Sequence, residues 1–463
     1  MSDATQGTGG AGKGEGVDHV PSTGAAMVVV PSLPHRFREG EAGARRSDEA
    51  RLEEAVGLAR AIDLDIRRAE IAPVPNPKPA TLLGPGKVAE LAEAVQETGA
   101  EVVIVDHALT PVQQRNLERE WKAKVLDRTG LILEIFGRRA ATKEGTLQVE
   151  LAHLDYQRGR LVRSWTHLER QRGGAGFLGG PGETQIEADR RILRDKITKL
   201  ERQLETVRRT RTLQRAKRAK VPHPIVALVG YTNAGKSTLF NRLTGADVVA
   251  QDMLFATLDP TLRRLSLPHG QLVILSDTVG FISDLPTQLI AAFRATLEEV
   301  READLILHVR DLSDPDNAAQ AEDVAGVLDS LDMPGEWRDR TLEVWNKIDA
   351  LDADTLDQAR SLAEATGDAA PRLVSAITGE GVDDLLATVE RRISGTISII
   401  EVELDADERA RLDWFYGNGH VTSRTDREDG GVSITVELTE AALADLRGAE
   451  RKTARTGAYD PLA

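Results

Sequence analysis

The stretch Gly230-Tyr-Thr-Asn-Ala-Gly235-Lys236-Ser237 decides the fold of the central part of this chain. It follows the apolar run Ile225–Val229 and precedes the helical pattern Thr238–Leu243. Glycines at this spacing, followed by lysine and serine between a strand and a helix, are typical of a phosphate-binding loop. Backbone N–H groups in such a loop converge on a phosphate at the N-terminus of the helix. We therefore expect a nucleotide-binding α/β domain around this stretch.

The last two residues of the loop carry side chains that suit a nucleoside triphosphate. We expect Lys236 to bridge the β- and γ-phosphates and Ser237 to offer its hydroxyl to Mg²⁺. A second motif, Asp277-Thr-Val-Gly280, ends the apolar run Leu272–Ser276. There Asp277 is placed to hold Mg²⁺ through a water molecule, and the Gly280 N–H is placed to meet the γ-phosphate. The spacing alone is weak evidence, because Asp127-Arg-Thr-Gly130 also has it.

A third motif, Asn346-Lys347-Ile-Asp349, predicts which base is bound. The Asp349 carboxylate can accept two hydrogen bonds from the N1–H and N2–H₂ edge of guanine, and adenine has no such pair of donors. A buried carboxylate without donors is costly, which favours GTP over ATP. We expect Asn346 and Lys347 to brace this loop and cover the base. A backbone N–H of Ser375-Ala376, after the last predicted strand, is expected to reach the guanine O6.

The stretch Phe255-Ala-Thr257-Leu-Asp259-Pro-Thr261 lies between the first two motifs. A GTPase needs a threonine here whose hydroxyl completes the Mg²⁺ shell when the γ-phosphate is present. We choose Thr257, and Thr261 is the alternative. Phe281 stands where many GTPases carry a glutamine that positions the attacking water, which a phenylalanine cannot do. We therefore expect slow intrinsic hydrolysis and a partner, or another part of the chain, that completes the site.

Together these motifs define one predicted site for GTP or GDP with Mg²⁺. The residues expected to act in catalysis are Lys236, Thr257 and Gly280, and those expected to hold Mg²⁺ are Ser237 and Thr257. Asn233 is similar to the asparagine of GTPases that recruit a potassium ion, so K⁺ is a candidate second cation. The expected nucleotide contacts are Gly230, Tyr231, Thr232, Asn233, Ala234, Gly235, Lys236, Ser237, Phe255, Ala256, Thr257, Leu258, Asp259, Asp277, Thr278, Val279, Gly280, Asn346, Lys347, Ile348, Asp349, Ser375, Ala376 and Ile377.

The chain outside this site divides by pattern. Short apolar runs alternate with helical patterns from Met27 to Ile135, which predicts a small α/β domain. Leucines repeat at steps of four and three from Leu147 to Leu168, and a second such stripe runs from Leu193 to Val207. Each stripe needs a partner, so they predict two arms of an antiparallel helical hairpin. Two ordinary amphipathic helices packed on a domain are the alternative.

The expected fold class is α/β, with a doubly wound, mainly parallel sheet in the nucleotide-binding part. Strands are expected at Ile225–Val229, Leu272–Ser276, Leu305–Val309, Leu342–Trp345 and Arg372–Val374. The small C-terminal part should have a strand at Ile397–Val402, a helix at Ala406–Phe415 and two strands that turn at Asp429–Gly430. The expected divisions are a disordered tail at 1–25, an N-terminal α/β domain at 26–140, a hairpin at 141–221 with a glycine-rich tip at 173–182, a P-loop domain at 222–393 and a small α+β domain at 394–463.

Composition excludes several classes of protein. The absence of cysteine rules out a disulfide framework, a thiolate metal site and a cysteine nucleophile, and it fits a reducing cytosol. The first 25 residues lack the features of a signal peptide, and no apolar run approaches the ~20 residues of a membrane span. We expect a cytoplasmic monomer without stable membrane insertion, although peripheral association with a membrane stays open.

Charge is distributed unevenly along the chain, whose net charge is −15. Residues 137–220 hold 21 lysines and arginines against 10 acidic residues, a net charge of +11, whereas the remainder holds 38 against 64. A basic segment in an acidic protein predicts a separate task, such as neutralising RNA phosphates. The alternatives are acidic lipid or a protein partner, as in a signalling or membrane-recruited GTPase. A lipid-binding helix should show an apolar face, but here that stripe is used in helix pairing.

The link between the two arms resembles the hallmark segment of the HflX family of bacterial GTPases. It reads Gly173-Gly-Ala-Gly-Phe-Leu-Gly-Gly-Pro-Gly-Glu-Thr-Gln-Ile-Glu-Ala-Asp-Arg-Arg191, and Leu109–Leu117, Asp127–Gly130 and Phe255–Thr261 are also similar to that family. The resemblance runs from about residue 27 to 393. It implies a GTPase that binds the large ribosomal subunit or the whole ribosome through its N-terminal region, including residues 137–220, and splits stalled ribosomes. Phe177-Leu178 departs from the family, which often has a basic residue there.

Overall fold

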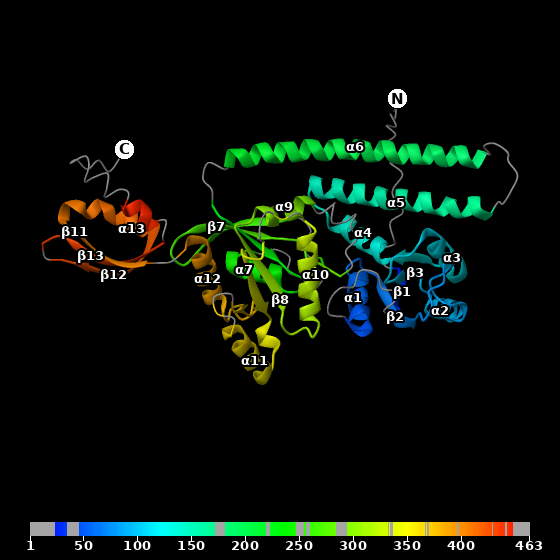
Figure 1. The fold of residues 1–463 in the computed structure, drawn as a ribbon, viewed down its shortest axis with the longest axis horizontal. Coiled ribbons are helices and arrows are strands. Elements are labelled where there is room, and N and C mark those ends of the chain that lie inside the picture. Colours follow the sequence, from blue (N-terminus) through cyan, green and yellow to red (C-terminus); the bar gives the residue numbers. More distant parts are fainter. Residues whose placement is uncertain are drawn as a thin grey trace, which may run out of the picture.

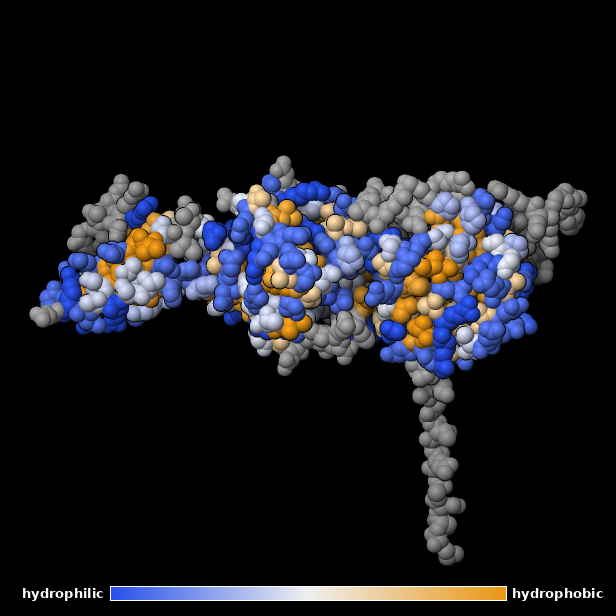
Figure 2. Space-filling view, turned by 90° about the horizontal axis from the view of Figure 1, so that it is seen from below, coloured by the Kyte–Doolittle hydropathy of each residue, from blue (hydrophilic) through white to orange (hydrophobic). Residues whose placement is uncertain are grey.

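The computed structural model describes most of the chain, and Figure 1 shows its parts arranged in a row, with a long helical hairpin above the N-terminal and central parts. The described residues are 24–34, 46–171, 181–218, 223–246, 254–255, 260–283, 294–331, 333, 337–365, 367, 370–395, 398–427, 429–439 and 442–447. Seen from below, Figure 2 shows three bodies in line, mostly hydrophilic on this face, with hydrophobic patches on each. No helix among the described residues is long and apolar enough to cross a membrane.

The N-terminal body is a parallel sheet with helices on it. Its strands, in the order β2-β1-β3-β4, are all parallel. The strands are β1 (Ala25–Ser32), β2 (Asp65–Pro73), β3 (Val102–Val105) and β4 (Lys124–Asp127), and the helices are α1 (Asp48–Arg60), α2 (Pro85–Thr98), α3 (Pro111–Trp121) and α4 (Arg128–Arg139). The central strands β1 and β3 are apolar and buried because helices cover both faces of a parallel sheet. The predicted α/β alternation is confirmed.

One predicted boundary in this body is wrong. Ala25, expected in the tail, already belongs to β1, since its carbonyl accepts a hydrogen bond of 2.8 Å from the Glu101 N–H. The rest of the predicted tail, residues 1–23, lies outside the described residues.

The helical hairpin consists of α5 (Lys143–Gln171) and α6 (Pro181–Arg218), which run side by side in Figure 1. Leu147 on α5 is buried with Leu200 and Leu204 on α6, and Leu151, Leu154 and Val207 pack against them. The leucine stripes therefore meet as predicted. The predicted tip is too long at its end, because Pro181 and Gly182 already belong to α6, and residues 172–180 of the tip lie outside the described residues.

The central body is built on a doubly wound sheet with the order β10-β9-β8-β5-β7-β6. All neighbours are parallel except β6 and β7. The strands are β5 (Ile225–Val229), β6 (Thr261–Ser266), β7 (Leu272–Asp277), β8 (Leu305–Asp311), β9 (Thr341–Asn346) and β10 (Arg372–Leu373). The helices are α7 (Lys236–Thr244), α9 (Arg294–Glu302), α10 (Asn317–Asp329), η2 (Ile348–Ala350), α11 (Ala353–Glu364) and α12 (Val382–Ser394). The five predicted strands are confirmed to within two residues, while the antiparallel edge strand β6 had not been predicted.

The C-terminal body is a small antiparallel sheet in the order β11-β13-β12. Its elements are β11 (Ser398–Leu404), η4 (Ala406–Arg411), α13 (Leu412–Asn418), β12 (Gly419–Asp426) and β13 (Val432–Leu438). The predicted helix Ala406–Phe415 is wrong in form, because its first half is a 3₁₀-helix. None of the six residues of η4 is buried, whereas Leu412 and Phe415 reach the core, so packing favours the α-helix only from Leu412 onward.

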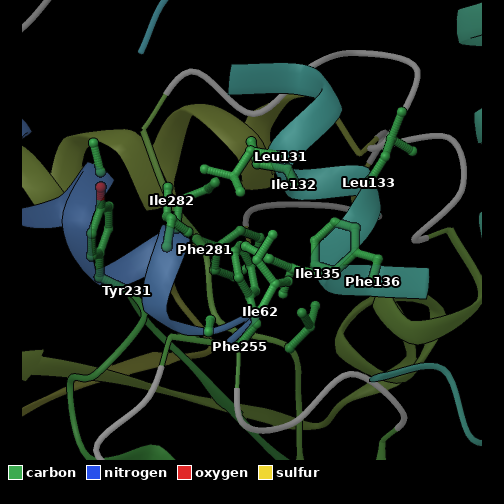
Figure 3. Packing of buried hydrophobic residues seen from close by; sticks show 14 of the residues in the cluster. Ile62, Leu131, Ile132, Leu133, Ile135, Phe136, Tyr231, Phe255, Phe281 and Ile282 are labelled. Carbon is green, nitrogen blue, oxygen red and sulfur yellow. The ribbon is translucent and has the colours of Figure 1, made fainter. Parts of the chain in front are cut away.

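The N-terminal and central bodies share one hydrophobic core, which we call the seam. Ile62 and Phe136 of the N-terminal body belong to the same buried cluster as Phe255 and Phe281 of the central body. The rings of Phe136 and Phe255 meet edge to face with centroids 4.7 Å apart. Figure 3 shows Phe281 and Ile282 pointing into the side chains of α4. The seam therefore places the end of the Asp277–Gly280 motif directly against the N-terminal body.

Candidate nucleotide-binding site

The phosphate loop joins β5 to α7 at the carboxyl edge of the central sheet, where α/β folds bind ligands. Gly230 and Gly235 have φ angles of 153° and 89°, which favour glycine. A Cβ on Gly230 would lie 2.1 Å from the Val309 carbonyl oxygen of β8, and one on Gly235 would lie 2.2 Å from the Asn346 Nδ2. Both glycines are therefore required by neighbouring strands that close around the loop.

Lys236 is the first residue of α7 and is buried. Its Nζ donates a hydrogen bond of 2.7 Å to the Tyr231 carbonyl oxygen, which curls the side chain back along the loop. Burial lowers the pKa of the Lys236 ammonium to about 8, and Asp277 offsets part of this effect. A phosphate beside this ammonium would favour its charged form, so the lysine suits an anionic ligand.

Ser237 and Asp277 lie together, as the sequence predicts for a magnesium site. The Ser237 Oγ donates a hydrogen bond of 2.8 Å to the Asp277 Oδ2, and Asp277 is fully buried at the end of β7. A hydroxyl beside a carboxylate is a donor set that fits a hard cation such as Mg²⁺. Among the described residues no group of three or more His, Cys, Asp or Glu side chains could hold a metal ion alone.

Asn346 ties the predicted base-binding loop to the phosphate loop. Its Nδ2 donates to the Ala234 carbonyl oxygen at 2.9 Å, and its Oδ1 accepts from the Ala376 N–H at 3.0 Å. Three segments that are distant in sequence therefore meet at one side chain. Arg242 of α7 holds the third of them by donating to the carbonyl oxygens of Ala376 and Ile377.

The turn that follows Asn346 exposes the Asp349 carboxylate, which is expected to read the base, to solvent. Lys347 has a φ angle of 66°, and its Nζ lies 2.6 Å from the Asp311 Oδ2. Ile348 is buried and anchors the turn, whereas Asp349 is exposed. Because Asp349 is exposed in this structure, only a bound nucleotide could bury its carboxylate. Ile377, with 68% of its surface exposed, is held by its backbone rather than by packing.

The Asp277–Gly280 motif is docked onto the phosphate loop. The Thr278 Oγ1 donates to the Leu228 carbonyl oxygen at 2.5 Å. The Phe281 N–H donates to the Gly230 carbonyl oxygen at 3.1 Å, and the Thr232 N–H donates to the Phe281 carbonyl oxygen at 2.7 Å. The Phe281 side chain is buried in the seam. The position where many GTPases carry a glutamine is thus occupied by a core side chain that packs among the buried residues of the seam (Figure 3).

Two further groups of predicted residues have different outcomes. Ala256, Thr257, Leu258 and Asp259, including the preferred magnesium threonine, lie outside the described residues. Phe255 is described, and its ring packs on Phe136 in the seam, so its side chain is a core group rather than a nucleotide contact. An aromatic residue beside a predicted switch is compatible with either role, which is why the sequence did not decide between them.

Sequence reasoning missed a group of charged residues that contact the phosphate loop from the N-terminal body. The Tyr231 hydroxyl donates to the carboxylate of Glu54 on α1 and accepts from the guanidinium of Arg46 at 2.8 Å. Glu54 and Tyr231 are 177 residues apart. A glutamate in an amphipathic helix gives no local sign of such a contact, so no sequence pattern could have revealed it.

The phosphate loop, the Asp277 motif and the Asn346 motif at one sheet edge define the class of a P-loop GTPase. Family models match the chain as "GTP-binding GTPase N-terminal" at residues 49–137, "GTP-binding GTPase Middle Region" at 139–218, "50S ribosome-binding GTPase" at 225–347 and "HflX C-terminal domain" at 362–457. The chain belongs to the HflX family of GTPases, enzymes that hydrolyse GTP.

The relatives cover most of the chain. The GTPase HflX of Magnetococcus marinus is 52% identical over 86% of this chain and 90% of its own length. The GTPase HflX of Escherichia coli is 48% identical over 78% of this chain and 83% of its own length. A crystal structure of a GTP-binding protein from Sulfolobus solfataricus in complex with GDP is 23% identical, covers 80% of this chain and 98% of that chain, and has a TM-score of 0.41.

Proposed function

We propose that this chain couples GTP binding and hydrolysis to association with the large ribosomal subunit, and that it splits stalled ribosomes. The observation that carries the proposal is one molecule with both a GTPase site and a basic helical hairpin. The family model matched at residues 225–347 is described as a 50S ribosome-binding GTPase, which supports the same partner. A ribosomal partner implies that the protein acts in the cytoplasm, and the proposed active form is a monomer.

The proposed nucleotide site uses the residues that meet at the carboxyl edge of the central sheet. Backbone N–H groups of 230–237 hold the phosphates, and the Asp349 carboxylate reads the guanine edge. The Asn346 side chain supports this assignment because it holds the base loop and the phosphate loop together. Asn233, whose φ angle is 62°, is the proposed ligand of a potassium ion.

Ser237 and Thr257 are the proposed magnesium ligands, with Asp277 acting through water. The 2.8 Å contact between Ser237 and Asp277 supports this set. Bound Mg²⁺ would neutralise charge on the β- and γ-phosphates. Lys236 would hold the same phosphates, and the Gly280 N–H would orient the γ-phosphate. Phe281 is buried in the seam, so this position supplies no group that orients the attacking water, which supports slow intrinsic turnover and stimulation by a partner of about 10³-fold or more.

The hairpin is the proposed ribosome contact. Arg191, Arg194, Lys196, Lys199 and Arg202 of α6 are all exposed, as expected of groups that neutralise RNA phosphates. The other arm is anchored to the N-terminal body, since the Tyr156 hydroxyl and Arg160 of α5 both donate to the Asp127 carboxylate. A rigidly held arm can transmit movement between the ribosome and the seam.

Sedimentation with purified ribosomes at several salt concentrations tests the proposal, together with GTP turnover measured with and without ribosomes. We expect binding that weakens steeply with salt and turnover that rises when ribosomes are added. Separation of 70S ribosomes into subunits, seen in a sucrose gradient, tests splitting. Failure to sediment with ribosomes even at low salt would reject the ribosome as the partner and leave the GTPase assignment intact.

A further inference from the structure

A buried cluster of charges joins the N-terminal body to the phosphate loop, and we call it the Glu54 cluster. Glu54 of α1 contacts Arg46, Arg128 of α4 and the Tyr231 hydroxyl. Arg128 also lies 2.5 Å from the Asp106 carboxylate, and Arg46 lies 3.5 Å from that of Asp316. Burial raises the pKa of the Glu54 carboxyl, but the two guanidinium groups outweigh it and lower this pKa to about 2. Glu54 is therefore ionised, and its charge is balanced across the boundary between the two bodies.

The Glu54 cluster holds Ser283, which lies three residues beyond Gly280. The Ser283 N–H donates to the Tyr231 hydroxyl at 2.8 Å. Arg128 donates to the Ser283 carbonyl oxygen at 2.9 Å and to its Oγ at 3.0 Å, and the Ser283 Oγ lies 3.2 Å from the Glu54 Oε1. Both backbone polar groups of Ser283 are thus satisfied by this cluster.

The segment that ends at Ser283 also contacts the phosphate loop, through Gly280 and Phe281. The Phe281 carbonyl oxygen accepts a hydrogen bond from the N–H of Thr232, which is one of the backbone amides of the phosphate loop. A methyl group on Gly280 would lie 2.8 Å from the Thr232 Cγ2 and 3.1 Å from the Lys236 Nζ. A phosphoryl group held between the Lys236 ammonium and the Gly280 N–H needs more room than a methyl group. A γ-phosphate that enters between these two groups must therefore move the Lys236 side chain, the Asp277–Ser283 segment or both.

We propose that the Glu54 cluster is a latch that holds the segment Asp277–Ser283 against the phosphate loop, so that Glu54 and the Tyr231 hydroxyl set the preference between GDP and GTP. GDP leaves the segment in place, whereas the γ-phosphate of GTP displaces it and pulls Ser283 from the cluster. GTP binding thereby loosens the contact between the N-terminal body and the GTPase body. Because coupling is reciprocal, a partner that draws the N-terminal body away favours GTP to the same degree.

This inference rests on the nucleotide site proposed above, and its test separates the two. Tyr231→Phe removes one oxygen from the latch, and Glu54→Gln removes its central charge. The measurement is the dissociation constant of each variant for fluorescent GDP and for a non-hydrolysable GTP analogue with Mg²⁺. We expect the ratio of analogue affinity to GDP affinity to rise about five- to tenfold in both variants, because only the analogue must break the latch.

Tyr156→Phe is the matched control, since that half-buried tyrosine of α5 donates its hydroxyl to Asp127 of the N-terminal body and lies outside the latch. GDP binding also reports that each variant is folded, and if Glu54→Gln does not fold, the affinity ratio of Tyr231→Phe carries the test alone. An unchanged ratio of the two affinities in the latch variants, or an equal change in Tyr156→Phe, would overturn the latch. If the unmodified protein binds neither nucleotide, the proposed site itself is wrong.

Discussion

Gly280 and Gly130 stand at the end of the same four-residue pattern, yet their surroundings give them different roles. Asp127 caps α4 by accepting from the Gly130 N–H at 2.8 Å, so this pattern is the N-terminus of a helix. Asp277 instead bonds Ser237 of the phosphate loop. Only the residue at the other end of the hydrogen bond separates the helix cap at Asp127 from the proposed magnesium group at Asp277, so predictions on this site begin with single side chains.

Lys236→Ala should abolish nucleotide binding or turnover. The change removes the one ammonium that is buried inside the phosphate loop, and a lost charged donor of this kind costs about 10²–10³-fold in rate. Binding of fluorescent GTP and single-turnover hydrolysis measure the effect. GTP hydrolysis at the normal rate by this variant would refute the site assignment.

Asp349→Asn should relax the choice of base. The exposed carboxylate keeps its turn through Ile348 and Lys347, so the variant should fold normally and lose only the acceptor pair for guanine. We expect GTP affinity to fall by about 10²-fold or more and XTP to become a better ligand than GTP. Competition between GTP, ATP and XTP measures this. Unchanged discrimination would mean that another residue reads the base.

Phe281→Gln should not restore fast hydrolysis, although it introduces the side chain that many GTPases use. The side chain at this position is buried in the seam, so an amide there is left without partners and packing is lost. We expect unfolding to become easier by about 2–5 kcal/mol in urea, with no gain in intrinsic turnover. A tenfold faster intrinsic rate would show that the side chain can reach the attacking water.

Among the elements, those with a strong local signal were predictable from sequence. α3 begins at Pro111 behind a capping box of Thr110 and Gln113, a start signal that stands in the sequence itself. β5 is a buried apolar run between clear breaks, and its bounds were predicted to the residue. The edge strands β6 and β2 gave no such signal, because β6 has three exposed residues in a row and β2 has only one buried residue. An edge strand forms through its neighbour, and a neighbour is not visible in a local window.

The contact between the turn after β6 and the C-terminal sheet predicts a dependence on pH. The His269 Nδ1 lies 2.5 Å from Glu390 of α12, its Nε2 lies 2.5 Å from Glu437 of β13, and the ring of His420 on β12 stands edge-on at 5.6 Å. Burial lowers the pKa of His269, but the two carboxylates outweigh it and raise this pKa above its ordinary 6.5. A raised pKa means that the contact is stabilised fully below pH 6.5 and loses this stabilisation as the pH rises through the raised value.

We expect the free energy of unfolding of the C-terminal body to fall between about pH 6.5 and the raised pKa, as the two carboxylates lose the cation between them. His269→Asn should abolish this dependence, and Glu437→Gln should move its midpoint to lower pH. Urea unfolding followed at several pH values by fluorescence of Trp414, which lies in this body, is the measurement. A pH profile identical in His269→Asn and the unmodified protein would exclude His269 as its source.

At the scale of the whole molecule, the seam could not be predicted from sequence. The sequence pattern predicted a small α/β domain and a GTPase domain as separate units. In the structure, Ile62 and Phe136 of the first pack in one core with Phe255 and Phe281 of the second. Each of these residues reads as ordinary core of its own domain. What the sequence did supply was the pairing of the hairpin arms and the motifs at the nucleotide edge, since both rest on short-range spacing. The orientation of one body on another depends on long-range contacts such as that of Glu54 with Tyr231.

The hairpin carries the last prediction, because it spans the molecule above the seam in Figure 1 and has the described basic surface most suited to RNA. Replacing Arg191, Arg194, Lys196, Lys199 and Arg202 of α6 with glutamine removes five exposed charges that lie far in sequence from the GTPase motifs. Each lost phosphate contact lowers the slope of log affinity against log salt by about 0.7–0.9. We therefore expect weaker ribosome binding, a shallower salt dependence and less stimulation of GTP turnover, with intrinsic turnover unchanged.

The matched control replaces Arg191, Arg194 and Arg202 with lysine, which keeps every charge and changes the shape and hydrogen bonding of the groups. If charge neutralisation alone drives binding, this variant should keep its salt slope and ribosome affinity nearly unchanged. If it loses affinity at an unchanged slope, the guanidinium groups make directed contacts in addition to neutralising phosphates. Full ribosome binding and stimulation by the glutamine variant would place the ribosome contact elsewhere, because a surface that binds RNA cannot lose five cations without losing affinity.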